Sequence, residues 1–194
     1  PAMQQLINLD KTIFKLVNGQ WTNSFFDWLM PWLRNSLVWL PLYLFLILFI
    51  SINFKRRAVW ILLFAIITVS LTDGISSHIF KPYFNRLRPC TDPDMSGMVR
   101  LLLSYRPGNG SFTSSHAANH FGIAMFLYAV LKNYFGRKMF LFFVWAASIS
   151  YAQVYVGVHY PFDILGGALL GCLVGYITAY SCSRFLSQKN NIKA

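Results

Sequence analysis

The chain has 194 residues, of which 56% are apolar and 12% are charged. Soluble proteins carry charge on about a quarter of their residues, so this chain lacks the polar side chains needed to cover a water-facing surface. It has 17 Lys and Arg residues against 6 Asp and Glu, and the basic residues stand in short clusters between apolar runs. This distribution argues against nucleic acid as a partner and favours anionic headgroups and a phosphorylated substrate.

Residues 1–35 are predicted to form two amphipathic helices. In the first, apolar residues recur at helical spacing beside charged ones: Leu6, Leu9, Ile13, Leu16 and Val17 stand beside Asp10, Lys11 and Lys15. The second, Trp21 to Leu33, is rich in aromatic side chains. Helices of this kind usually lie in the plane of the membrane interface, and the three charges argue against a sixth span.

Five apolar runs follow, each close to the roughly 20 residues that a membrane-spanning helix needs. They cover residues 36–53, 58–80, 114–131, 139–156 and 161–185. The sequence therefore predicts an all-α integral membrane protein, a bundle of about five transmembrane helices over residues 36–185. Within it, residues 81–113 form a polar loop that we expect to carry the active site, and residues 186–194 are predicted to be a cytoplasmic tail.

Charges in the short loops predict the orientation. The turns at residues 55–57 and 132–138 and the C-terminal tail are all basic and fall on one side of the bundle, so we expect that side to be cytoplasmic. The opposite side also carries basic residues, but a phosphate site needs them there. The three polar motifs described next would then face outward.

The first motif joins Lys81 to Arg88 in the polar loop. Pro82 follows the lysine and Pro89 follows the arginine, and we expect Pro82 to end the second span at about Phe80. A lysine point charge and an arginine fork on a stiff turn suit the oxygens of one phosphate. If this motif stood alone, the better explanation would be that Lys81 and Arg88 are ordinary basic residues whose side chains extend to the membrane interface.

The second motif, Ser111 to His116, leads into the third span. Backbone N–H groups at a helix start bind anions, and the hydroxyls of Ser114 and Ser115 lie at the same place. A serine of this turn can also cap the helix, which is compatible with anion binding. His116 stands in the first turn and could reach a leaving oxygen.

The third motif places His159 four residues before Asp163, at the start of the fifth span. A carboxylate in that turn can accept the N–H of one imidazole nitrogen, which leaves the other nitrogen free to act as a nucleophile. The alternative is a helix-start carboxylate favoured by the helix dipole, beside an unrelated interfacial histidine.

Together the three motifs resemble the pattern of the phosphatidic acid phosphatase type 2 superfamily, which includes bacterial lipid phosphatases. That pattern reads Lys, six residues, Arg-Pro; then Pro-Ser-Gly-His; then Ser-Arg, five residues, His, three residues, Asp. The chain matches it at Lys81, Arg88, Pro89, Ser114, His116, His159 and Asp163. It departs from the pattern at Thr113, Ser115, Ala152 and Gln153, and the resemblance covers roughly residues 80–171.

The resemblance implies a reaction through a phosphohistidine. His159 would attack phosphorus, Asp163 would orient it, and His116 would protonate the departing oxygen and later activate water. The phosphate would be bound by Lys81, Arg88, Ser114, Ser115 and Gln153. By the same resemblance we expect the protein in the bacterial inner membrane, with its site facing the periplasm.

Gln153 stands where the family has a phosphate-binding arginine. A charge-assisted hydrogen bond contributes about 1.5–3 kcal/mol, against about 1 kcal/mol for a neutral one. Weaker phosphate binding and compensation by Arg86 or Arg106 are both open. We do not expect inactivation, because both candidate catalytic histidines and Asp163 are present.

Asp73 lies within the second span, where an ionisable residue is a functional candidate. It precedes Lys81 by about two helical turns, so it could support that lysine, or it could pair with His78. No metal or cofactor is expected. His116 and His120 are four residues apart, but the metalloprotease pattern needs Glu directly after the first histidine, and alanine stands there.

We therefore expect a lipid phosphatase, with undecaprenyl diphosphate favoured on general grounds. Phosphatidylglycerophosphate and a lipid A phosphate fit as well, and so does transfer of the phosphoryl group to another lipid. A lipid-phosphate carrier is the alternative from a different class, although binding alone needs no nucleophile. Membrane lipids are expected partners, nucleic acid is not, and the oligomeric state is open.

Overall fold

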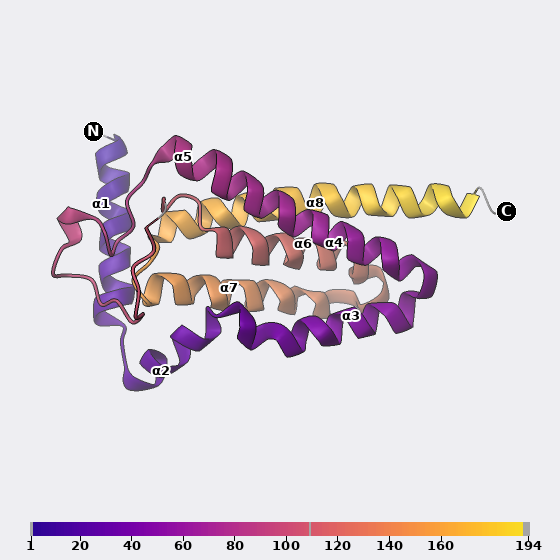
Figure 1. Ribbon diagram of the computed structural model, residues 1–194, viewed down its shortest axis with the longest axis horizontal. Coiled ribbons are helices and arrows are strands. Elements are labelled where there is room, and N and C mark those ends of the chain that lie inside the picture. The colour runs from indigo at the N-terminus through magenta and orange to yellow at the C-terminus, as the bar shows by residue number, and fades with distance from the viewer. Residues whose placement is uncertain (1, 109, 192–194) are drawn as a thin grey trace.

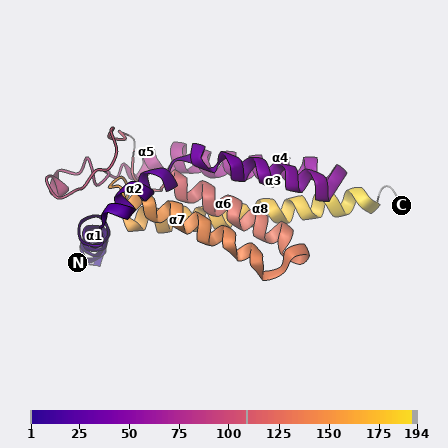
Figure 2. The ribbon, with the colours of Figure 1, turned by 90° about the horizontal axis from the view of Figure 1, so that it is seen from below.

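The computed structural model describes residues 2–108 and 110–191, which form helices joined by turns and loops, without a strand in that part of the chain (Figure 1). The helices are α1 (Ala2–Lys15), α2 (Ser24–Leu33), α3 (Leu40–Phe54), α4 (Ala58–Gly74), α5 (Lys81–Phe84), α6 (Ser115–Phe135), α7 (Leu141–Tyr155) and α8 (Pro161–Asn191). Short 3₁₀ segments cover Ser36–Trp39, Lys55–Arg57, Pro93–Met95 and Gly136–Phe140, and π-helical turns cover Leu16–Gln20 and Ile75–Phe80. The five long helices α3, α4, α6, α7 and α8 run lengthwise as one bundle (Figures 1 and 2).

These five helices lie where the sequence predicts five spans. Among the described residues, two helical segments qualify by length and composition as membrane-crossing, Ser36–Phe84 and Pro161–Lys189. The first contains both α3 and α4, which fold back on each other at the basic turn Lys55–Arg57. The all-helical prediction is confirmed, whereas the count of five crossings stays a prediction.

Large apolar side chains are exposed along the outer faces of the long helices. Examples are Leu48 and Ile52 on α3, Ile66 on α4, and Leu169 and Leu173 on α8. Soluble monomers rarely expose apolar surface on this scale. A hydrocarbon environment explains it, because apolar side chains are at no disadvantage there.

Glycines let α8 pack directly on the backbone of α6. A methyl group at Gly171 would lie 2.3 Å from the carbonyl oxygen of Ala118, and one at Gly175 would meet the α6 backbone just as closely. Small residues four apart share one helix face and allow such close approach. The first turns of the two helices consequently meet, and the Ser114 N–H donates to the Asp163 carbonyl at 3.0 Å.

Helix α1 runs across one end of the bundle and is seen end-on in Figure 2. Its protein-facing side buries Asp10 and Phe14, both with no exposed surface. Leu6 and Leu9 are each 49% exposed. The helix therefore keeps part of its predicted apolar face free, as a helix lying on a membrane interface would, while a residue of the predicted polar face is buried.

The second span does not end at Phe80, as the prolines suggested. A π-helical turn, Ile75–Phe80, leads directly into α5, which continues to Phe84. Pro82 falls in the first turn of α5, where the missing N–H is tolerated. The helix ends instead at Asn85, which adopts the left-handed conformation with φ 41° that is common just past a helix end.

The last helix also runs beyond its predicted end at residue 185. No Gly or Pro interrupts the segment that follows, so α8 continues to Asn191 and takes in most of the predicted tail. Lys189 places its Nζ 4.4 Å from the centre of the Trp60 ring, a cation–π contact that holds this turn against α4. Residues 192–194 lie outside the described residues.

Candidate active site

A cavity of about 290 Å³ lies at the end of the bundle, between the helices and the loop of residues 85–113. It gathers side chains from all three sequence motifs. The lining consists of Arg34, Asp73, Ser77, Lys81, Arg88, Tyr105, Pro107, Ser115, His116, Gln153 and His159. Both candidate catalytic histidines therefore face one space.

His159 lies between a carboxylate and a guanidinium group. Its Nδ1 lies 3.4 Å from Oδ2 of Asp163, and its Nε2 lies 3.0 Å from Nη1 of Arg88. Because the carboxylate accepts and the guanidinium donates, we assign the proton to Nδ1 and the lone pair to Nε2. Burial lowers the pKa of His159 to about 4, although the bond to Asp163 raises it. The ring is thus neutral at neutral pH, as a nucleophile must be.

Asp163 is fully buried and is fixed by several donors. Its Oδ2 accepts the hydroxyl of Ser111 in a very short hydrogen bond and the backbone N–H of Tyr160 at 2.8 Å. Its Oδ1 pairs with Nη1 of Arg86 at 2.7 Å. The carboxylate therefore has a single orientation toward His159, and Ser111 of the second motif belongs to this support.

Arg86 pairs with Asp163 and does not line the cavity. Its Nη2 pairs with Oδ2 of Asp10 at 2.5 Å, so the guanidinium bridges two buried carboxylates. Burial lowers the pKa of Arg86, but the two carboxylates raise it and prevail. Asp10 also accepts the backbone N–H of Phe162 at 2.9 Å, which satisfies a donor in the first turn of α8. Compensation of Gln153 by Arg86, one of the possibilities left open by the sequence, gains no support here, because this charge is already paired with two carboxylates.

Two buried cations face the cavity from the first motif. The Nζ of Lys81 donates to Oγ of Ser115 at 2.8 Å, and that hydroxyl also lies 3.1 Å from Ser76 and 3.2 Å from Ser77. Lys81 and Arg88 are 7% and 5% exposed. Cations so close and so poorly hydrated destabilise each other, and an anion between them removes this cost.

Two of the predicted residues are placed elsewhere. Ser114 is the N-cap of α6, where its hydroxyl accepts the N–H of Ala117 at 3.4 Å, and it is absent from the cavity lining. Arg106 lines a separate cavity of about 160 Å³ together with Cys90. Neither side chain joins the group around His159.

Asp73 lies on the side of the cavity that holds Lys81. Its Oδ1 accepts a hydrogen bond from Asn119 at 3.3 Å. The His78 ring instead contacts the carbonyl of Gly74 at 3.3 Å. Asp73 and Lys81 both line the cavity without an ion pair between them in the described residues, so support of the lysine stays a prediction.

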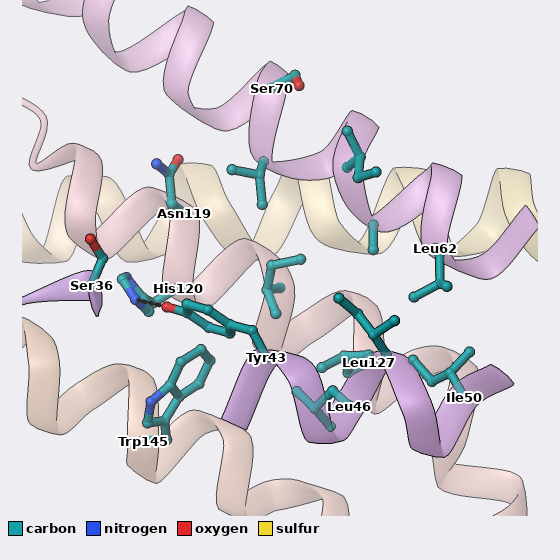
Figure 3. Close-up of a pocket in the computed structure, with 15 residues that line it drawn as sticks. Ser36, Tyr43, Leu46, Ile50, Leu62, Ser70, Asn119, His120, Leu127 and Trp145 are labelled. Atoms are coloured by element: carbon teal, nitrogen blue, oxygen red, sulfur yellow. Dashed lines mark hydrogen bonds between the residues drawn. The ribbon is translucent and has the colours of Figure 1, made fainter. Parts of the chain in front are cut away.

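The structure also has a second, apolar cavity of about 580 Å³ (Figure 3). It lies between α3, α4 and α6 and is lined mainly by aliphatic side chains. At its polar end, His120 Nε2 lies 3.3 Å from the Tyr43 hydroxyl, and the His120 ring stacks on that of His116 with centres 6.3 Å apart. The pair His116–His120 thus separates the polar cavity from the apolar one.

Arg34 is a cavity residue that the sequence did not reveal. It follows α2, and its Nε donates to Oε1 of Gln153 at 3.3 Å, while its Nη1 donates to the Tyr105 hydroxyl at 3.2 Å. A single arginine after an aromatic helix is typical of any interfacial segment, so the pattern gave no signal.

Within residues 2–108 and 110–191, no group of three or more His, Cys, Asp or Glu side chains is arranged to hold a metal ion.

A neutral histidine oriented by a carboxylate, facing buried cations and a second histidine, is the equipment of a phosphoryl-transfer enzyme. The family model of the PAP2 superfamily matches residues 58–186. The chain therefore belongs to the PAP2 superfamily, and it is a phosphatase.

Relatives of known activity cover most of the chain. It is 30% identical over 174 residues to a lipid A 4'-phosphatase of Bacteroides thetaiotaomicron, across 89% of this chain and 76% of that protein. It is 27% identical over 179 residues to an undecaprenyl-diphosphatase of Sulfolobus acidocaldarius, across 90% and 79%. The crystal structure of Aquifex aeolicus LpxE is similar with a TM-score of 0.63 and 27% identity, covering 88% of this chain and 94% of that one.

Proposed function

We propose that the protein is a membrane lipid phosphatase that works through a phosphohistidine on His159. One observation carries this proposal. The Nε2 of His159 faces a cation-lined cavity while its Nδ1 is held by the buried carboxylate of Asp163. Such an arrangement supplies a nucleophile for phosphorus, which a site for binding alone does not need.

The reaction has two steps. First, Nε2 of His159 attacks phosphorus, the bond from phosphorus to the lipid oxygen breaks, and His116 donates a proton to the departing oxygen. Water then attacks the phosphohistidine, His116 takes a proton from that water, and the N–P bond breaks to release inorganic phosphate. Asp163 stabilises the positive charge that develops on the His159 ring in each step.

The cations supply the main stabilisation. In phosphoryl transfer, charge is spread over the three non-bridging oxygens, and fixed cations and donors lower the barrier. Lys81 and Arg88 provide two such cations, and Ser115 adds a hydroxyl that already contacts the lysine. Because the folded protein already holds Lys81, Arg88 and Ser115 in place, little reorganisation is needed during the reaction.

The lipid tail would enter the apolar cavity. Its walls are chiefly aliphatic, and it begins where His120 stacks on His116. A phosphate in the polar cavity therefore places the attached lipid beside an apolar space of about 580 Å³. Burial of acyl or isoprenyl carbons there contributes about 0.8 kcal/mol for each CH₂.

We propose a lipid A phosphate as the first candidate substrate. The chain covers 76% of a lipid A 4'-phosphatase at 30% identity, which supports this choice. Undecaprenyl diphosphate, favoured from the sequence alone, is the second candidate, and the 27% identity to an undecaprenyl-diphosphatase supports it.

We propose that the site opens on the periplasmic side of a bacterial inner membrane. The turn between α3 and α4, the turn between α6 and α7, and the end of α8 all lie at the opposite end of the bundle from α1, α2 and α5 (Figure 1). The two turns contain Lys55–Arg57 and Gly136–Phe140, both basic. The positive-inside rule favours the cytoplasm for that end.

The substrate assay uses the purified full chain in detergent, without and with a chelator. Lipid A, undecaprenyl diphosphate and phosphatidylglycerophosphate are offered in turn, and released inorganic phosphate is measured. We expect the highest kcat/KM with lipid A and no effect of the chelator. Appearance of a new phosphorylated lipid instead of free phosphate would show transfer rather than hydrolysis.

The nucleophile is tested by His159→Ala, which should abolish phosphate release while leaving lipid binding largely intact. His78→Ala is the matched control, because His78 is an exposed histidine of the same end of the bundle and does not line the cavity. We expect His78→Ala to retain wild-type activity. Phosphate release by His159→Ala would show that another group attacks phosphorus.

A further inference from the structure

Arg34 reaches the cavity from outside the part of the chain that the family model matches. The match begins at residue 58, whereas Arg34 follows α2 in the N-terminal segment. Its side chain lines the cavity beside His116 and His159. The guanidinium is held there by two hydrogen bonds, from Nε to Gln153 and from Nη1 to Tyr105.

The charge of Arg34 is not neutralised by the protein. Among the residues that the structure describes, Arg34 forms no ion pair, whereas Arg86 and Arg100 each pair with a carboxylate. Two further cations, Lys81 and Arg88, line the same cavity. A half-buried cation beside others of the same sign costs free energy unless an anion arrives.

The contact with Gln153 orients the guanidinium. Gln153 has no exposed surface, and its Oε1 accepts the Nε–H of Arg34. Within the described residues, both N–H groups of Nη2 lack a protein partner and so remain available as donors. A guanidinium with paired donors suits the oxygens of a phosphate.

We propose that Arg34 binds the phosphate of the substrate, so that the N-terminal segment supplies a charge that Gln153 cannot. This inference rests on the proposed phosphatase site and adds a phosphate-binding residue to it. The neutral amide positions the arginine, and the arginine contacts the phosphate. The N-terminal helices are accordingly part of the active site rather than only a membrane anchor.

The test begins with Arg34→Gln in the full chain. We expect kcat/KM to fall about tenfold to a hundredfold, the range of one lost charge-assisted hydrogen bond. The inhibition constant of orthovanadate, a phosphate analogue, should rise by a similar factor, which a purely structural role would not produce. For Arg34→Lys, both kcat/KM and the vanadate inhibition constant should lie between those of the wild type and those of Arg34→Gln, because lysine keeps the charge but loses the planar fork.

An exchange of the two side chains is the sharper test. The double variant Arg34→Gln/Gln153→Arg returns a guanidinium to the same contact from the other side, and we expect it to recover most of the lost kcat/KM and vanadate affinity. Gln153→Arg alone should not exceed the wild type, because it adds a fourth cation to the lining. The control Arg137→Gln makes the same charge change at the far end of the bundle and should leave kcat/KM and vanadate affinity unchanged.

The outcomes separate this inference from the proposed function. Wild-type kinetics and wild-type vanadate inhibition in Arg34→Gln would overturn the role of Arg34 while leaving the phosphatase intact. If the wild type releases phosphate from none of the lipids, the proposed substrate class fails, and Arg34 is tested through vanadate binding. Vanadate should then raise the Tm of the wild type more than that of Arg34→Gln, and an equal rise would refute the inference. If Arg34→Gln does not fold, Arg34→Lys and the double variant decide by the same two measurements.

Discussion

The helical bundle and the N-terminal segment contribute to the site in different ways. The α6–α8 pair carries His116 and Asp163 on helix starts that are held together by backbone contact at Gly171, and His159 lies two residues before α8. The N-terminal segment, residues 2–35, supplies Asp10 and Arg34, which reach the site through their side chains. The bundle thus fixes the chemistry through its backbone, and the N-terminal segment adjusts the charge around it.

This difference means that the two regions should fail differently. A change in the bundle moves several catalytic groups at once, because they share one packed interface. A change in the N-terminal segment removes one charge and acts on His159 only through other side chains. The variants below compare the two regions, beginning with the largest expected effect.

Asp10→Ala tests the charge link between the two regions. The variant leaves Arg86 with Asp163 alone and removes the acceptor of the Phe162 N–H. Breaking a buried pair from one side costs about 3–5 kcal/mol, so we expect a clear fall in Tm in detergent. The kcat/KM should fall as well, since Arg86 then pulls more strongly on the carboxylate that orients His159.

Asp94→Ala is the matched control for this variant. Asp94 also pairs with a cation, Lys11 at 2.9 Å, but its side chain is 79% exposed. Exposed pairs contribute about 0–1 kcal/mol, so neither Tm nor kcat/KM should change appreciably. Equal losses in the two variants would mean that Asp10 acts only as a surface charge.

The sequence predicted the bundle side of this comparison well. Helices lie at all five predicted runs, and the spacing of Lys81, Arg88, His116 and His159 identified residues that line one cavity. Spacing along one short segment, such as His159 to Asp163, translates directly into geometry, so the sequence could group these residues; their catalytic roles stay predictions.

The N-terminal contribution could not be predicted in this way. Asp10 meets Arg86 across 76 positions and Arg34 meets Gln153 across 119. Such contacts depend on where α1 and α2 dock, which no local periodicity encodes. The position of Arg106 could not be inferred for a related reason, because residues 85–108 contain little regular structure from which a direction could be predicted.

Gly171→Ala tests the bundle side. The added methyl group would lie 2.3 Å from the Ala118 carbonyl oxygen, which neither backbone can avoid without separating α6 from α8. Overpacking of this kind costs about 1–3 kcal/mol, so Tm should fall, and kcat should fall with it because both helix starts move.

Gly74→Ala provides the comparison, because a methyl group there meets nothing within 4 Å. Alanine is about 1 kcal/mol better than glycine inside a helix, so Tm should stay the same or rise. A Gly171→Ala protein as stable as Gly74→Ala would show that α6 and α8 are not held by close backbone contact.

The smallest expected effect is on the pH dependence of stability. It should have opposite signs for His159 in the bundle and for Asp10 in the N-terminal segment. The pKa of His159 is lowered from 6.5 to about 4, first by burial. Its contribution to stability is therefore present above pH 6.5 and is lost as the pH falls toward 4. Burial raises the pKa of Asp10 above 3.8 despite the opposing bond to Arg86. The stability that comes from this shift is complete below pH 3.8 and is lost as the pH rises through the raised value, where the ionised carboxylate pairs with Arg86.

The Tm measured as a function of pH separates these contributions when each residue is replaced by a neutral one. As the pH falls from 6.5, the wild type should lose stability relative to His159→Gln, because its buried ring must take up a proton. As the pH rises from 3.8, it should lose stability relative to Asp10→Asn, because its buried carboxyl must ionise. If the two Tm differences, wild type against His159→Gln and wild type against Asp10→Asn, changed in the same direction with pH, the opposite pKa shifts of His159 and Asp10 would be wrong.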